Sequence, residues 1–240
     1  MIVIDKLTKA FGYYPVLRGI DLTVERGQFV GLLGPNGSGK TTLLRILAGL
    51  SKPTTGRVTI GGWQVPEEIA AVQRQIGIVS HLPLLYDTLT AEENLLFFAR
   101  LYNLPTSERA DRAHTMLKRV GLEKRSRDLV QTYSRGMQQR LAIARALLHD
   151  PAILFVDAPY TGLDQDASAL LDELLREVTG ITEGARTAIM TTHDLRRAYN
   201  LTSHIVILSR GKVGYYDTTA TLSVNDLPQI YATTTGAAAA

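Results

Sequence analysis

Residues 29–50 decide the fold and read FVGLLGPNGSGKTTLLRILAGL. The stretch begins with an apolar run, Phe29 to Leu33, continues through a glycine-rich loop and ends in apolar residues at helical spacing, Leu43 to Leu50. This order predicts a buried strand, a tight loop and a helix. Because the loop fills every fixed position of a phosphate-binding loop in that context, the chain is expected to bind a nucleoside triphosphate.

The loop supplies the groups that hold a polyphosphate. Its glycines let backbone N–H groups point inward at the positive end of the following helix. Lys40 is expected to reach the β and γ oxygens, and the hydroxyl of Thr41 to bind Mg²⁺. A glycine-rich turn without a ligand is the alternative, which the complete pattern disfavours. The residues expected to contact the triphosphate are Gly34, Pro35, Asn36, Gly37, Ser38, Gly39, Lys40, Thr41 and Thr42.

The rest of the chain predicts an α/β fold. Short apolar strands between Ile2 and Leu33 indicate a β-rich opening, a helical pattern follows from about Pro66, and buried strands then alternate with helices after Tyr133. We predict a phosphate-loop NTPase core with a mainly parallel sheet, an N-terminal antiparallel β subdomain and an inserted α-helical subdomain. The predicted single domain, 1–240, has its core at about 1–80 and 150–240, the helical subdomain at about 81–149 and a frayed tail at 233–240.

Composition limits the classes of function. The 240 residues include no cysteine, so disulfides and thiolate metal sites are excluded. A net charge of +3 is too small to indicate a nucleic-acid partner or a polybasic membrane anchor. No apolar run approaches the roughly 20 residues that span a bilayer, and the first ten residues lack an apolar signal core. The chain is therefore expected to stay in the cytoplasm.

A carboxylate ends a second buried strand. Ala152 to Val156 is apolar and is followed by Asp157, the arrangement that places an acid beside the Mg²⁺ of a phosphate-loop enzyme. A capping aspartate after a core strand is the alternative. Together with the loop, the pattern makes Asp157 the expected magnesium ligand, beside Thr41.

A third segment carries a family resemblance. Ser134-Arg135-Gly136-Met137-Gln138 stands before an apolar-periodic helix, so Ser134 is at least a helix cap. These five residues resemble the signature motif of ATP-binding cassette (ABC) transporter subunits, and the whole chain resembles such a subunit. The resemblance implies that they complete the ATP site of a second, facing cassette, which is either another copy of this chain or a paralogue. It also implies an integral membrane permease as partner, which would hold the chain at the inner face of the cell membrane.

Other residues follow the family pattern in order. Phe11 matches the aromatic residue that stacks on adenine, with Tyr13 and Tyr14 as rival stacking residues and a role in the core as the other alternative. Residues 160–164, ending in Asp164, resemble the loop that contacts the facing subunit. His193 matches the histidine that touches the γ-phosphate, and a surface histidine at a strand end is the alternative that this position disfavours. The resemblance thus implies catalytic assistance from Lys40, Asp164 and His193.

Position 158 departs from the family. In the family, the strand carboxylate is followed by a glutamate that deprotonates the attacking water, whereas this chain has Ala158 at that position. A methyl group neither accepts a proton nor holds a water, so we expect ATP binding with hydrolysis reduced by about 10²–10⁴-fold. An engineered substitution and a naturally degenerate site both fit this residue.

His81 is the second departure, because most of the family has a glutamine there that touches Mg²⁺ and couples to the membrane subunit. Histidine would make that contact dependent on pH. The segments 78–83 and 89–95 are similar to the haem-exporter-type cassette of cytochrome c maturation, and short drug, sodium or lipid exporters look nearly the same.

Two other classes of function remain open. One is a soluble cassette protein acting on ribosomes or DNA, although such proteins usually carry two cassettes or a long coiled-coil insertion. The other is an ATP-sensing module without turnover, which Ala158 would suit.

Overall fold

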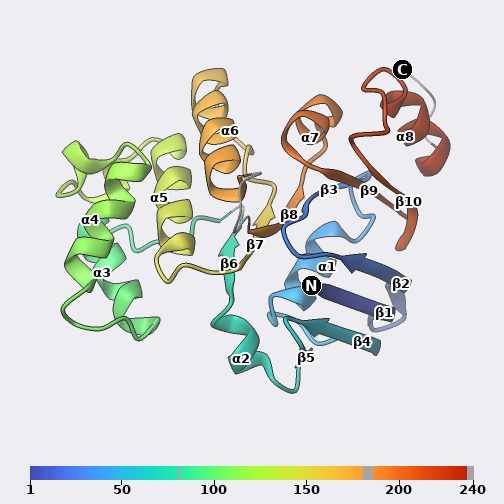
Figure 1. Ribbon diagram of the computed structural model, residues 1–240, viewed down its shortest axis with the longest axis horizontal. Coiled ribbons are helices and arrows are strands. Elements are labelled where there is room, and N and C mark those ends of the chain that lie inside the picture. The colour runs from blue at the N-terminus through green and yellow to red at the C-terminus, as the bar shows by residue number, and fades with distance from the viewer. Residues whose placement is uncertain (81, 181–185, 237–240) are drawn as a thin grey trace.

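A central sheet carries the glycine-rich loop in the computed structural model, which describes residues 1–80, 82–180 and 186–236 (Figure 1). Its strands in those residues are β3 (Phe29–Leu33), β6 (Ile76–Val79), β7 (Ile153–Asp157), β8 (Thr187–Thr191), β9 (His204–Ser209) and β10 (Lys212–Thr218). They are ordered β10-β9-β3-β8-β7-β6, and all neighbours except β9 and β10 are parallel. β3, β7 and β8 are buried along their whole length, which is why their sequences are mainly apolar, with polar residues only at the ends of β7 and β8.

A second, antiparallel sheet covers helix α1 (Lys40–Leu47). It consists of β1 (Ile2–Phe11), β2 (Tyr14–Val24), β4 (Thr55–Ile60) and β5 (Trp63–Val65), in the order β2-β1-β4-β5. Figure 1 shows α1 between the two sheets, and one apolar cluster joins Ile4 of β1, Ile46 of α1 and Leu32 of β3. β1 and β2 are longer than the sequence predicts, because their backbone pairing continues through several register shifts to Phe11 and Tyr14.

The described residues between β6 and β7 form three α-helices: α3 (Ala91–Leu101), α4 (Arg109–Arg119) and α5 (Arg135–Leu147). In Figure 1 they lie together at the β6 edge of the central sheet. α3 begins with a capping box, in which Glu93 N donates to Thr90 Oγ1 at 3.2 Å and Thr90 N donates to the Glu93 carboxylate at 2.8 Å. The other α-helices in the part of the chain that the structure describes are α2 (Ile69–Gln73), α6 (Gln165–Thr179), α7 (Leu195–Leu201) and α8 (Leu227–Thr235). The predicted fold class is confirmed.

The end of the chain corrects one expectation. Residues 233–235, predicted to fray, belong to α8, which is followed by Gly236 with φ 71°. Tertiary packing outweighs the low helix propensity of threonine here, because Gly214 of β10 leaves room for Thr234: a Cβ at position 214 would lie 2.5 Å from Thr234 Cγ2. Residues 237–240 of the expected tail lie outside the described residues. In the part of the chain that the structure describes, no helix has the length and apolar character needed to cross a bilayer.

Candidate nucleotide site

The loop between β3 and α1 is shaped by close backbone approach. A Cβ on Gly34 would lie 2.2 Å from the carbonyl oxygen of Leu208, and one on Gly39 would lie 2.6 Å from Leu17 Cδ2. Both glycines have positive φ, 145° and 106°. Gly37 differs, since a Cβ there would meet no described atom within 4 Å. The loop is therefore packed closely against Leu208 and Leu17 at Gly34 and Gly39, and it is open around Gly37.

The start of α1 leaves backbone N–H groups without a side-chain cap. Gly39 precedes α1 without any side-chain cap, and no acidic residue lies in the first helical turn. The N–H groups of that turn are thus left for an anion. Ser38 is 3% exposed, and its hydroxyl has no hydrogen-bond partner among the described residues. The uncapped N–H groups of α1, rather than this buried hydroxyl, fit a phosphate ligand.

Lys40, the first residue of α1, folds back over the loop. Its ammonium donates to the carbonyl oxygens of Gly34 at 2.7 Å and Pro35 at 2.9 Å. Burial lowers the pKa of Lys40, and the carboxylate of Asp157 opposes this shift. The ammonium is thus a partly desolvated cation placed beside the loop. Pairing with phosphate oxygens would stabilise its charge there.

Thr41 and Asp157, far apart in sequence, meet at the carboxyl edge of the central sheet. The Thr41 hydroxyl donates to Asp157 Oδ1 at 3.2 Å, and Asp157 is 8% exposed. Thr191 of β8 also donates to Oδ1, at 2.7 Å. A carboxylate and a hydroxyl are hard oxygen donors of the kind that Mg²⁺ prefers, so the residues present fit that ion. Sequence reasoning missed Thr191, whose signal was a polar residue at the end of a buried strand.

Ala158 has an unusual backbone conformation, with φ 47°. Its N–H donates to Thr191 Oγ1 at 2.8 Å, and its carbonyl oxygen accepts from the Thr161 hydroxyl at 3.1 Å. The segment that follows ends at Asp164, whose carboxylate caps α6 by accepting from Ala167 N at 2.7 Å. The methyl group of residue 158 therefore stands directly after the candidate magnesium ligand, in a well-anchored backbone.

His193 follows β8, which lies between β3 and β7 in the sheet. Because parallel strands end at one edge, His193 lies at the same edge as the loop and Asp157. Its side chain is exposed. Asp194, the next residue, caps α7 by accepting from Arg197 N at 2.9 Å. His81, the other histidine predicted for this site, lies outside the described residues.

Three aromatic side chains project from the turn between β1 and β2. Phe11 is 54% exposed, Tyr13 is 101% exposed and Tyr14 is 79% exposed. The Lys9 ammonium lies 4.8 Å from the Phe11 ring centroid. All three rings are accessible to a nucleobase. Adenine stacking on Phe11 therefore stays a prediction, with the two tyrosines as alternatives.

The segment predicted to act on a facing subunit begins α5. The Ser134 hydroxyl oxygen accepts from Met137 N at 3.3 Å, as an N-cap. Gly136 is packed against the first turn of α6, since a Cβ there would lie 2.8 Å from Ala167 Cβ. A Cβ on Gly162 would likewise lie 3.8 Å from Arg135 Cγ. The structure thus places residues 134–138 beside the 160–164 segment, while their action on a second subunit remains a prediction.

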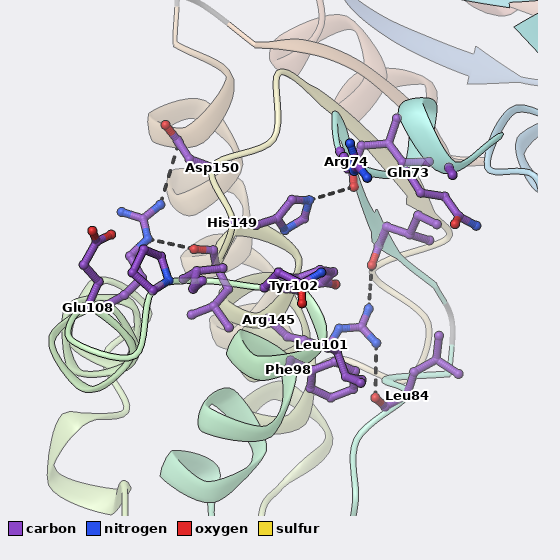
Figure 2. A pocket seen from close by; sticks show the side chains of 18 of the residues that line it. Gln73, Arg74, Leu84, Phe98, Leu101, Tyr102, Glu108, Arg145, His149 and Asp150 are labelled. Atoms are coloured by element: carbon purple, nitrogen blue, oxygen red, sulfur yellow. Dashed lines mark hydrogen bonds and ion pairs between the residues drawn. The ribbon is translucent and has the colours of Figure 1, made fainter. Parts of the chain in front are cut away.

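A cavity of about 1040 Å³, which sequence reasoning did not predict, lies between α2, β6, α3 and the end of α5 (Figure 2). Its buried arginine, Arg145, donates to the carbonyl oxygens of Ile78 at 2.6 Å and Leu84 at 3.1 Å. Burial lowers the pKa of the Arg145 guanidinium. His149 stacks on Tyr102, with ring centroids 4.0 Å apart. We call this cavity the α3–β6 groove.

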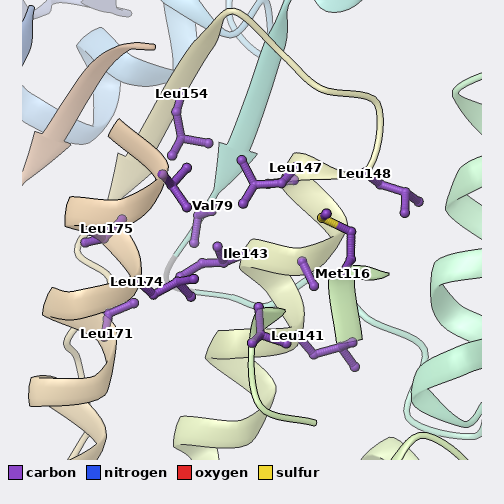
Figure 3. Close-up of a cluster of buried hydrophobic side chains, with 14 of the residues drawn as sticks. Val79, Met116, Leu141, Ile143, Leu147, Leu148, Leu154, Leu171, Leu174 and Leu175 are labelled. Atoms are coloured by element: carbon purple, nitrogen blue, oxygen red, sulfur yellow. The ribbon is translucent and has the colours of Figure 1, made fainter. Parts of the chain in front are cut away.

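Helix α5 connects the Ser134 segment to the α3–β6 groove. It is buried on several sides, and Figure 3 shows Ile143 and Leu147 among side chains from β6, β7 and α6. Val79, Leu154 and Leu174 belong to the same apolar cluster. Close packing of this kind leaves α5 little freedom to move independently of its neighbours.

Sequence comparison agrees with this geometry. The family described as ABC transporter matches residues 17–161. The linearmycin resistance ATP-binding protein LnrL of Bacillus subtilis (strain 168) is 36% identical over 213 residues, 89% of this chain and 68% of that protein. The ABC transporter ATP-binding protein NatA of the same organism is 37% identical over 200 residues, 83% of this chain and 80% of NatA. The daunorubicin resistance ATP-binding protein DrrA3 of Streptomyces coeruleorubidus is 38% identical, over 88% of this chain and 66% of that protein.

Structural comparison gives the same family. A dimeric ATP-binding cassette in a post-hydrolysis state, bound to ADP and Pi, superposes with a TM-score of 0.81 and 32% identity. The match covers 91% of this chain and 99% of that one. A structure described as the ATP-binding subunit of an ABC transporter has a TM-score of 0.82 and 28% identity over 95% of this chain.

Proposed function

The chain belongs to the ABC transporter family, and on that premise we propose that it binds Mg–ATP between two head-to-tail cassettes to drive transport by a membrane permease. The observation that carries this proposal is the meeting of Thr41, Asp157 and Thr191 beside the open phosphate loop. Lys40 and the N–H groups of the first turn of α1 would hold the triphosphate, and Thr41 and Asp157 would hold Mg²⁺. The ion would neutralise charge on the phosphates.

The second cassette would close this site. Residues 134–138 of the facing cassette would approach the γ-phosphate through the start of α5, where Ser134 is the N-cap. His193 would contact the same phosphate from the edge of the sheet. The dimeric cassette with ADP and Pi, 32% identical to this chain, supports pairing of two cassettes.

Hydrolysis in this chain would be slow. Ala158 occupies the position from which a carboxylate would take a proton from the attacking water, and its methyl group supplies no base. We expect turnover lowered by about 10²–10⁴-fold relative to a chain with glutamate there. The site would hold ATP and favour the closed pair of cassettes. An ATP-sensing cassette without turnover is the second candidate function, and Ala158 is the residue that favours it.

The α3–β6 groove is where the permease would dock. Its lining includes Leu84, Phe98 and Leu101, and Leu84 and Leu101 are 52% and 59% exposed. Exposed apolar side chains beside a cavity are typical of a surface that another protein covers. The permease would then hold the chain at the inner face of the membrane. The names of the resistance proteins quoted above favour transport out of the cell. The resemblance of residues 78–83 and 89–95 to haem exporters would make this chain part of one particular class of exporter.

Two measurements test the proposal. The molecular mass of the chain in solution, measured with and without saturating ATP–Mg²⁺, should double with the nucleotide. A chain that stays monomeric would contradict head-to-tail closure. Affinity purification from its native membranes should recover an integral membrane protein at a fixed ratio, and Leu101→Asp in the groove should abolish that recovery. Recovery of ribosomes or DNA would favour a soluble cassette protein.

A further inference from the structure

The guanidinium of Arg197 lies where three segments meet. Arg197 is in the first turn of α7, shortly after His193. Its Nε lies 3.2 Å from Asp172 Oδ1 on α6 and donates to Oδ2 at 3.3 Å. Its Cζ lies 4.1 Å from the ring centroid of Tyr160. One side chain therefore holds both an ion pair and a cation–π contact.

These contacts are shielded from solvent. The side chains of Arg197 and Asp172 are 24% and 20% exposed, so salt and water weaken their attraction less than for a surface pair. Burial of the Tyr160 hydroxyl, with the Asp172 carboxylate nearby, raises the pKa of Tyr160 well above its ordinary value. Tyr160 thus stays neutral under Arg197, and its ring face remains available for the cation.

The three partners belong to functionally different segments. Tyr160 lies between Ala158 and Asp164, in the loop that follows the candidate magnesium ligand. Asp172 is on α6, the helix that Asp164 caps. Arg197 continues the segment that carries His193 and Asp194, and its Nη1 lies 3.8 Å from Asp194 Oδ2. A displacement of either loop would have to move the guanidinium or break its contacts.

We infer that Arg197 is a positioning residue, which fixes the 158–164 loop relative to His193 so that nucleotide contact and closure of the second cassette occur together. The inference rests on the proposed function, because it assumes that His193 meets the γ-phosphate and that the 158–164 loop meets the facing subunit. Arginine suits this task better than lysine, since its planar group stacks on the Tyr160 ring while its N–H donors face Asp172.

The test separates nucleotide affinity from dimer closure. Arg197→Met should leave the dissociation constant of the monomer for ATP–Mg²⁺, measured with a fluorescent ATP analogue, within about twofold. It should raise the dimer dissociation constant at saturating ATP–Mg²⁺, measured by analytical ultracentrifugation, about tenfold. Arg197→Lys should recover only part of this loss, and Tyr160→Phe, which keeps the ring, should match the parent chain. Arg196→Met, an exposed neighbour on the same helix, is the matched control.

Each outcome has a defined meaning. Tyr160→Leu removes the ring without removing a charge, so it should weaken the dimer even if Arg197→Met folds poorly. Equal dimer dissociation constants for the parent chain and both variants, measured on the folded fraction, would overturn the inference and leave the proposed function standing. Full recovery by Arg197→Lys would also overturn it. A parent chain that stays monomeric in saturating ATP–Mg²⁺ would overturn the proposed function itself, and this inference with it.

Discussion

The hydroxyl of Thr191 holds the carboxylate of Asp157: the bond to Oδ1 is 2.7 Å long, and the same hydroxyl oxygen accepts the N–H of Ala158 at 2.8 Å. One threonine therefore orients both the candidate magnesium ligand and the backbone of Ala158, the position at which we propose that a general base is absent. Asp157 and Thr191 lie directly opposite each other on the adjacent parallel strands β7 and β8.

Replacing Thr191 should weaken magnesium-dependent binding. Thr191→Val keeps the shape of the buried side chain but removes the bond to Asp157, so the affinity for ATP–Mg²⁺ should fall about 10–100-fold, as for other groups that orient a metal ligand. Affinity for ATP in EDTA should change much less. Calorimetric titration in both conditions checks this. Thr179→Val, which removes another buried hydroxyl bond in α6, should change neither affinity.

Restoring a carboxylate at position 158 should restore turnover. Ala158→Glu should raise steady-state ATP hydrolysis by about 10²–10⁴-fold, because it supplies the general base. Ala158→Gln, similar in size but unable to take the proton, should remain slow. Phosphate release under saturating ATP–Mg²⁺ is the measurement. An unchanged rate in the glutamate variant would favour the ATP-sensing function.

A side chain at Gly136 should strain the contact between α5 and α6. In Gly136→Ala the new Cβ would lie 2.8 Å from Ala167 Cβ, so one helix must shift. We expect a loss of about 1–2 kcal/mol in the free energy of unfolding, since overpacking outweighs the gain in helix propensity. Urea denaturation checks this, and the double variant with Ala167→Gly should recover most of the loss. Additive effects of the two changes would contradict the steric explanation.

Loss of Arg145 should destabilise the floor of the α3–β6 groove. Arg145→Met keeps the length of the buried chain but leaves the carbonyl oxygens of Ile78 and Leu84 without this donor. The expected cost in unfolding free energy is about 2–4 kcal/mol. Arg100→Met, on the exposed side of α3, should cost less than about 0.5 kcal/mol. Equal costs for the two variants, measured by denaturant unfolding, would contradict the prediction.

Stability should fall as the solution becomes acidic. Burial is the main cause that lowers the pKa of both His149 and His204 from the ordinary value of 6.5. Below about pH 6.5 the unfolded chain therefore binds protons that the folded chain does not. The stability contributed by the two neutral rings is complete above that pH, and it is lost as the pH falls toward the lowered folded-state pKa values. Unfolding free energies between pH 8 and 5 check this, and His149→Phe, which can still stack on Tyr102, should reduce the pH dependence.

Much of the fold was predictable because it depends on local patterns. The run Phe29 to Leu33, the glycine-rich loop and the strand that ends at Asp157 each carry their signal within a few residues. The correct α/β class follows from them. Pairing of β1 and β2 out to Phe11 was not predictable in this way, since it depends on backbone hydrogen bonds that leave little mark on side-chain pattern.

The parts of the site that sequence reasoning missed depend on contacts between distant segments. Thr191 becomes relevant only when β8 is placed beside β7, and Arg197 only when α7 is placed beside Tyr160. The α3–β6 groove likewise needs Arg145, Ile78 and Leu84 to be assembled from three segments. Such groups have no characteristic spacing along the chain, so the order of the strands has to be known first.

Helix α5 has 13 residues and is therefore a rod about 20 Å long. Ser134 caps one end, and Arg145 lies in the last turn at the other. Residues 137–147 include neither proline nor glycine, so the rod has no hinge of its own. If α5 tilts at the groove end, Ser134 at the other end would be displaced as well, because the helix does not bend in between. A proline in the middle of α5 would kink the helix. It would thereby uncouple Ser134 from the groove without changing the residues at either end.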